Sequence, residues 1–348
     1  MTPDRRHFLT SALALGALHA FPGISLAQAR RLVFATFTGS WEEAHRDVLV
    51  PAFRKANNDA EITLDPMLSV DQIAKVKASL ANPPIDVMLH DPGPALQAID
   101  QGLIENFPVA QSAHYKDLIA DAQLETGPAP FFQVVGITYN PEKIKTPPTS
   151  WADIWKPEFK GRVGITNLNS TLGTGWLVEI ARMRGGDENN VDAAFKAIQE
   201  LKPNLAAVAA NPGALATLYQ QGQIDIGPGN FNAIQILKAR GVPVEFVAPK
   251  EGAIAFQTSI HIVKNSPNKE LAVKLIEAAL SPEVQAKLME SPYLIVPTNT
   301  KVKMSGEIAK VLAKDHDDMK KKFVFQNWKK INQQRAGWIE KFNRDIKL

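Results

Sequence analysis

The chain has 348 residues, of which 45% are hydrophobic and 22% charged, with a formal net charge of +3 and no cysteine. This length exceeds that of a typical single core and predicts two lobes of roughly 150 residues each. The near-neutral charge gives no reason to expect nucleic acid as a partner. The lack of cysteine excludes disulfides, thiol catalysis and a lipidated cysteine anchor.

The N-terminal segment has the pattern of an export signal. Arg5 and Arg6 precede an apolar run over 12–27 and a small-residue Ala-Gln-Ala site that ends at Ala29. We therefore expect a twin-arginine signal peptide over 1–29 that is cleaved near Ala29. The run is broken by proline and glycine, which disfavours both a membrane span and the alternative of a buried N-terminal helix. Together with the missing cysteine anchor, this predicts a soluble periplasmic protein.

Short apolar strands alternate with amphipathic helices in the first part of the chain. Strands are expected at 32–36, 62–64, 87–89 and 134–138. Ser40 and Glu43 have the spacing of a capping box, which predicts a helix running toward Asn57 with a kink at Pro51. The alternation is typical of an α/β architecture with largely parallel sheets.

The same alternation resumes after the loop that contains Pro147 and Pro148. Ser150 and Asp153 are expected to cap a short helix. The spacing of apolar residues over 191–201 predicts one buried helix face. Further strands are expected at 163–166, 224–227, 244–247 and 259–263. The segment STLGTG should lead into a helix that ends at Gly185 and Gly186, and further helices should start at Pro267 and at Ser281 with Pro282.

The chain carries no motif that organises catalysis or cofactor binding. It has no HExxH metal spacing, no GxSxG elbow, no phosphate-binding P-loop and no complete GxGxxG fingerprint. We therefore expect no catalytic residue, no metal site and no cofactor. An exported enzyme and a purely structural protein are the less favoured alternatives.

Polar loops instead recur where a strand ends and a helix begins. In open α/β sheets such strand ends line the ligand crevice, and helix N-termini present backbone N–H groups there. Each residue taken singly fits helix capping better, but together they favour a binding cleft. The residues are Thr38, Gly39 and Ser40 after the first strand, His90 and Asp91 after the third, Ser170 and Thr171 after 163–166, and Asn230 after 224–227.

Several stretches resemble the periplasmic solute-binding proteins of ABC importers, in the group that includes the spermidine and putrescine binders. They include FTGSWEEAHRDVLVPAF, DVMLHDPGPALQAIDQGLIE, SWADIWKPEFKGRVGIT and EGAIAFQTSIHIVKNSP. The resemblance implies a type II periplasmic-binding-protein fold, with two α/β lobes, a hinge and a central ligand cleft. It also implies a monomeric receptor that is not an enzyme and that delivers a small-molecule solute to an inner-membrane ABC permease.

The resemblance further implies that each lobe is built from discontinuous segments. We expect lobe 1 to comprise 30–137 and 258–302, and lobe 2 to comprise 138–257 and 303–348.

This sequence departs from the polyamine-binding pattern at positions where that group of proteins holds its ligand. Alignment with that group places Gly39, Thr171 and Thr258 where it has acids, and Asn230 where it has an indole. Burying an ammonium group without a counter-charge costs several kcal/mol, whereas hydroxyl and backbone N–H groups suit an anion. Asp91 remains in a cleft loop and could hold one amine.

We therefore predict a small anionic or zwitterionic solute, with a polyamine as the alternative. Trp41 and Phe256 either form apolar walls for this solute or belong to the core of the lobes.

Overall fold

The computed structural model describes residues 30–346. The predicted signal peptide over 1–29 lies outside these described residues. Twelve strands form one mixed sheet whose main path runs β2-β1-β3-β10-β5-β8-β6-β7. The strands are β1 (Arg30–Thr36), β2 (Ala60–Pro66), β3 (Val87–His90), β4 (Ile104–Glu105), β5 (Phe131–Tyr139), β6 (Val163–Thr166), β7 (Leu205–Ala209), β8 (Ile226–Asn230), β9 (Glu245–Val247), β10 (Ala253–Val263), β11 (Val296–Pro297) and β12 (Phe323–Phe325).

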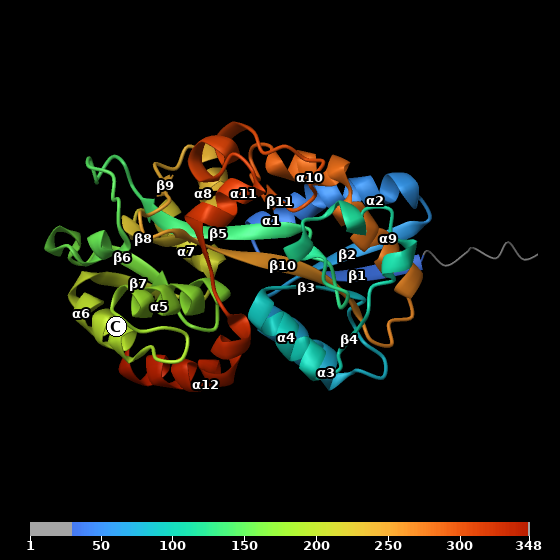
Figure 1. Ribbon diagram of the computed structural model, residues 1–348, viewed down its shortest axis with the longest axis horizontal. Helices are drawn as coiled ribbons and strands as arrows, with labels where there is room; N and C mark the ends of the chain where they lie inside the picture. Colours follow the sequence, from blue (N-terminus) through green and yellow to red (C-terminus); the bar gives the residue numbers. More distant parts are fainter. Residues whose placement is uncertain (1–29, 347–348) are drawn as a thin grey trace, which may run out of the picture.

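Helices cover the sheet in both halves of the molecule (Figure 1). They are α1 (Ser40–Ala44), α2 (Val50–Ala56), α3 (Ser69–Ala78), α4 (Pro92–Asp100), α5 (Thr171–Met183), α6 (Asp192–Leu201), α7 (Pro212–Gln220), α8 (Phe231–Ala239), α9 (Lys269–Leu280), α10 (Pro282–Met289), α11 (His316–Lys322) and α12 (Trp328–Asp345). Within the described residues, none of these helices has the length and apolar character needed to cross a membrane.

The two lobes meet along β5 and β10, which run side by side between them (Figure 1). Strand β10 changes partner along its length. Residues 254–258 pair with β5 in one lobe, and residues 259–262 pair with β3 in the other. The sheet therefore passes from lobe to lobe within one continuous strand. The predicted boundary at 257/258 lies next to this change, although the exact limits of the lobes stay a prediction.

The expectation of largely parallel sheets is wrong for the centre of the molecule. The outer strands are parallel, as in β1 with β2 and β6 with β7. The two longest strands, β5 and β10, are antiparallel to each other. Strand β5 is also antiparallel to β8, and β10 is antiparallel to β3. The sequence suggested only residues 259–263 for β10, because the preceding AIAFQT segment lacks a clear alternation. That segment is almost entirely buried.

Several predicted helix starts are confirmed. Ser150 and Asp153 form the expected capping box, although the turn that they cap is a 3₁₀ helix. The hydroxyl of Ser281 accepts a hydrogen bond from the Val284 N–H, and Pro282 is the first residue of α10, as expected. Helix α9 begins at Lys269 rather than at Pro267, so that prediction is wrong by two residues.

The predicted capping box at Ser40 is also wrong. Helix α1 begins at Ser40 itself, and its N-cap is Gly39, which has a φ of 71° and no side chain. A π-helical turn, His45–Leu49, separates α1 from α2. Pro51 cannot donate a backbone hydrogen bond, and just before it the Val50 N–H reaches back five residues to the His45 carbonyl. The predicted distortion near Pro51 is therefore this wider turn.

The largest apolar cluster spans both lobes, and a second cluster fills the rest of the second lobe. The large cluster includes α1, α2, α9 and α10 of the first lobe and continues through β5 to Leu215 of α7, Phe231 of α8 and Phe246 of β9. The second cluster contains Trp151, Trp176 and Phe195, and it also takes Ile331, Trp338 and Phe342 from α12. The C-terminal helix thus completes the core of the second lobe.

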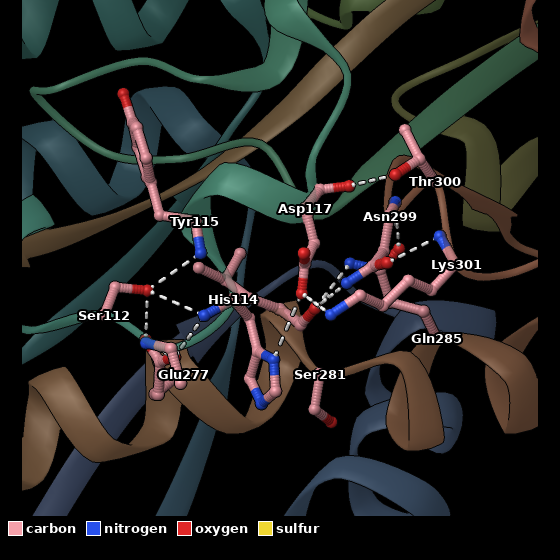
Figure 2. A network of polar contacts seen from close by, with 12 residues as sticks. Ser112, His114, Tyr115, Asp117, Glu277, Ser281, Gln285, Asn299, Thr300 and Lys301 are labelled. Carbon is pink, nitrogen blue, oxygen red and sulfur yellow. Dashed lines mark hydrogen bonds and ion pairs between the residues drawn. The ribbon is translucent and has the colours of Figure 1, made fainter.

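A carboxylate fixes the long loop that follows β4 in the first lobe. Figure 2 shows Glu277 of α9 facing this loop. Its oxygens accept hydrogen bonds from Ser112 Oγ at 2.6 Å, from the Ala113 N–H at 2.8 Å and from the His114 N–H at 2.9 Å. Nearby, Lys301 Nζ lies 2.7 Å from Asp117 Oδ2. These contacts anchor a segment that has little regular structure of its own.

Changing Glu277 to alanine should leave three donors without their acceptor. We expect the free energy of unfolding to fall by about 1–3 kcal/mol, measured by urea denaturation. Glu270 is exposed on the same helix, so Glu270→Ala should change stability by no more than about 0.5 kcal/mol. Equal effects of the two substitutions would contradict the anchoring role of Glu277.

Candidate functional site

A cavity of about 180 Å³ lies between the lobes. Its walls come from the loop between β1 and α1, the ends of β3 and β8, and the first turns of α5 and α7. Nine of the eleven sequence-predicted residues line it: Thr38, Gly39, Ser40, Trp41, Asp91, Ser170, Thr171, Asn230 and Phe256. The structure thus brings together residues from four separate strand ends. Ligand binding by these residues remains a prediction.

The other two predicted residues, His90 and Thr258, lie behind the cavity wall. His90 is the last residue of β3 and is fully buried, with its ring 5.4 Å from that of His261. Burial lowers the pKa of His90 well below its usual value, so this ring is neutral. Thr258 is fully buried in β10, where its hydroxyl accepts a hydrogen bond from Gln133 at 3.1 Å. Both residues belong to strands that extend further than the sequence suggested.

Trp41 and Phe256, which the sequence assigns either to the core or to a wall of the solute site, are core residues that also border the cavity. Trp41 is 5% exposed, and its ring lies 5.7 Å from that of Phe131. Phe256 is 2% exposed and packs edge-on against Trp328 at 6.2 Å. Both side chains therefore belong to the core, and both also border the cavity.

Asp91 is the N-cap residue of α4, but its carboxylate does not cap the helix. Instead it accepts a hydrogen bond from Gln133 Nε2 at 2.7 Å. Burial raises the pKa of Asp91 to about 6, even though interactions with Thr171, Arg335 and Gln133 oppose this shift. The carboxylate is therefore ionised near neutral pH in a site that disfavours its charge.

Arg335 of α12 supports the loop that precedes α5. Its side chain is 3% exposed and donates to Thr174 Oγ1 at 3.1 Å and to the carbonyls of Leu168 and Asn169 at 3.2 and 2.9 Å. Burial lowers the pKa of Arg335 to about 10, so it stays charged at neutral pH. This charge helps to keep Asp91 ionised and also fixes the start of α5.

Two polar contacts join α1 of the first lobe to the α8 region of the second. Asn232 Nδ2 donates to Ser40 Oγ at 3.1 Å, and Arg240 lies 2.5 Å from Glu43. All four residues line the cavity. The lobes are therefore in contact at residues that line the cavity. The ion pair is partly exposed and on its own contributes only about 0–1 kcal/mol.

Sequence reasoning missed several residues of the cavity. Gln133 lies within β5, where no turn or cap marks it. Pro212 and Gly213 open α7 after Asn211, whose side chain caps the helix through the Ala214 N–H. The Asn-Pro-Gly sequence is a strand-end signal of the kind used for the other loops, and it could have identified this wall.

The described part of the chain, residues 30–346, holds no group of three or more His, Asp or Glu side chains that could bind a metal ion. The cavity is instead bordered by amide, hydroxyl and apolar side chains, together with a few charged groups. Such a surface can hold a small polar organic molecule through hydrogen bonds and one or two ionic contacts.

Comparisons with known proteins agree with this geometry. The chain is 34% identical over 145 residues to the spermidine/putrescine-binding periplasmic protein of Escherichia coli, and the match spans 41% of each chain, less than half of that relative. It is 26% identical over 301 residues to the gamma-aminobutyric acid-binding protein of Pseudomonas aeruginosa, covering 81% of each.

The fold is likewise similar to that of a solved structure, an ABC transporter protein from Clostridium perfringens. The identity is 27% and the TM-score 0.70, over 91% of this chain and 100% of the other. This fold is that of transport binding proteins. The sequence profile of bacterial extracellular solute-binding proteins matches residues 49–320, which is more than half of the chain. The protein therefore belongs to the family of bacterial extracellular solute-binding proteins.

Proposed function

We propose that this protein is the solute receptor of an ABC importer and binds a small zwitterionic organic molecule in the cavity between its lobes. It works in the periplasm as a monomer, after removal of residues 1–29, and delivers its solute to an inner-membrane permease without chemical change. Family membership and the interlobe cavity support this role. The choice of a zwitterion as the solute rests on the charged groups that line the cavity.

Among the described residues that line the cavity, Glu43, Asp91 and Arg240 are charged. Glu43 and Arg240 pair with each other, so each offsets the other's charge. The positive charge that acts on Asp91 is that of Arg335. This side chain is buried behind the cavity wall and donates hydrogen bonds to backbone carbonyls. The cavity therefore offers one carboxylate to a positively charged group.

The wall formed by α5 and α7 suits a negative group. Thr171 and Leu172 of α5 and Gly213 of α7 line the cavity at the first turns of these helices. The first N–H groups of a helix lack carbonyl partners within it and favour an anion by about 0.3–1 kcal/mol. The site thus combines one acidic side chain with a wall suited to an acid group.

A zwitterion satisfies both features of the cavity. A purely anionic solute would face the Asp91 carboxylate, and a diamine would place its second ammonium group near helix N-termini without a carboxylate of its own. The Pseudomonas relative is named for a zwitterion, gamma-aminobutyric acid, which supports this choice. The E. coli relative is named for polyamines, so these compounds are the direct competitors in the test.

The solute class can be tested by thermal denaturation of the purified protein with 4-aminobutyrate, 2-aminoethylphosphonate, butyrate, putrescine or spermidine. A ligand at 100 times its dissociation constant stabilises the folded state by about 2.7 kcal/mol. We expect an increase of several degrees in Tm with at least one zwitterion. Strong stabilisation by putrescine or spermidine, with none by the zwitterions, would contradict the proposed class.

A receptor returns its solute unchanged. We expect mass spectrometry to recover the bound zwitterion intact after long incubation with the protein, in an amount equal to that added. Conversion of the compound at a rate proportional to protein concentration would favour an exported enzyme instead.

Asp91 should lower the stability of the unliganded protein at neutral pH. Its pKa of about 6 in the folded state exceeds the ordinary value of 3.8, so the folded state holds the proton more tightly. The resulting penalty on folding is absent well below pH 3.8, grows as the pH rises to about 6 and is then constant.

Asp91→Asn removes this penalty. We expect it to raise the free energy of unfolding by about 1–3 kcal/mol at pH 7.5, with most of that gain lost at pH 4. Urea denaturation at the two pH values measures the difference. Asp192 is 80% exposed in its side chain and pairs with Lys341 at the surface, so Asp192→Asn serves as the control and should give no gain in stability at pH 7.5. A loss of stability in Asp91→Asn at pH 7.5 would refute this account of Asp91.

A further inference from the structure

The hydrogen bonds around Asp91 determine the direction of two neighbouring amide groups. An ionised carboxylate can only accept hydrogen bonds. The Gln133 amide must therefore present its NH₂ group to Asp91, and Nε2 lies 2.7 Å from Asp91 Oδ1. The same nitrogen donates to Thr258 Oγ1 at 3.1 Å, which uses its second hydrogen. Both donors of Gln133 are thus committed.

The direction of Gln133 in turn fixes that of Asn230. With its NH₂ group turned to Asp91, Gln133 presents Oε1 to Asn230, whose Nδ2 donates to it at 3.0 Å. Asn230 Oδ1 is then left as an acceptor. It is buried, and among the described residues it has no hydrogen-bond partner. The chain from Asp91 through Gln133 to Asn230 therefore ends in an unused acceptor on a residue that lines the cavity.

A buried hydrogen-bond acceptor without a partner destabilises the protein. A solute that donates a hydrogen bond to this acceptor removes the penalty and therefore binds more tightly. The group that completes the site must donate hydrogen bonds and must also be compatible with the Asp91 carboxylate. A primary ammonium group meets both requirements, because it has three donors and a positive charge. A carboxylate has no donor, and a quaternary ammonium has the charge without the donors.

We propose that Asp91 and Asn230 form a subsite for the primary ammonium group of the solute, and that Gln133 is the positioning residue that engages the Asn230 NH₂ group and so leaves the Asn230 oxygen as a free acceptor. This assignment rests on the proposed function and deepens it. The charge of Asp91 attracts the amine, while Asn230 distinguishes an ammonium that carries hydrogens from one that is fully methylated. Gln133 does not need to touch the solute.

The experiment uses isothermal titration of the purified protein with three matched compounds at pH 7.5. The probes are 4-aminobutyrate, its trimethylammonium analogue, and butyrate, which lacks the nitrogen. The variants are Asp91→Asn, Asn230→Ala and Gln133→Met, with Asp192→Asn as the control. Ratios between probes within one variant cancel any general loss of folding or cavity shape, so a merely structural role of a residue would leave them unchanged.

The wild-type protein should prefer 4-aminobutyrate over butyrate by at least tenfold and over the trimethylammonium analogue by several-fold. Asp91→Asn should bring the preference over butyrate close to one. Asn230→Ala and Gln133→Met should both reduce the preference over the trimethylammonium analogue, and Asp192→Asn should change neither ratio.

Two results would overturn the subsite and are distinguishable. If the wild-type protein binds neither 4-aminobutyrate nor any other zwitterion of the thermal-denaturation series, the subsite falls together with the proposed class of solute. If it binds 4-aminobutyrate with the same preferences in Asp91→Asn and Asn230→Ala as in the wild type, the receptor function stands and the subsite alone is wrong. If Gln133→Met keeps the wild-type ratios while Asn230→Ala changes them, Gln133 does not position Asn230.

Discussion

The partly buried carboxylate of Asp91 is the constraint that orients the polar groups around it. Its charge is held in a cavity that disfavours it, as the raised pKa of about 6 indicates. The surrounding groups are arranged to keep it ionised and in place: Gln133 donates to it, and Arg335 supplies a positive charge from behind the wall. A charged side chain whose environment destabilises its charge is typical of binding sites.

The same constraint links the two lobes. Asp91 follows β3 of the first lobe, while Asn230 ends β8 of the second, and Gln133 of β5 connects their side chains. Arg335 reaches the site from the C-terminal helix and fixes the loop before α5. The cavity is therefore assembled from distant parts of the chain, and hydrogen bonds across the cleft hold its shape when the lobes are together.

Much of this cavity could be predicted from the sequence, for a physical reason. Strand ends and helix starts carry local signals, such as Ser170 before Thr171, and the topology of α/β sheets brings these ends together. Gln133 could not be found in this way, because it lies within a strand and owes its role to pairing with residues that are distant in the chain. The sequence pattern places His90 in a loop although it ends β3, because the last residue of a strand carries no signal of its own.

The fold shows the same division between local and long-range information. The capping box at Ser150 depends on residues three apart and was predicted correctly. The antiparallel pairing of β5 with β10 joins segments more than a hundred residues apart, and no local pattern indicates it. The capping box predicted at Ser40 is absent, and the cause is again a contact between residues distant in the chain. The Ser40 hydroxyl accepts a hydrogen bond from Asn232 across the cleft.

Proton release on binding reports whether an ammonium group binds beside the Asp91 carboxylate. With a pKa of about 6, Asp91 is half protonated at pH 6, and a bound ammonium group would lower that pKa and expel the proton. Titration calorimetry with 4-aminobutyrate in buffers of different ionisation enthalpy should therefore detect release of up to about half a proton per solute at pH 6 and almost none at pH 8. Binding with no proton release at pH 6, or with proton uptake, would contradict the account.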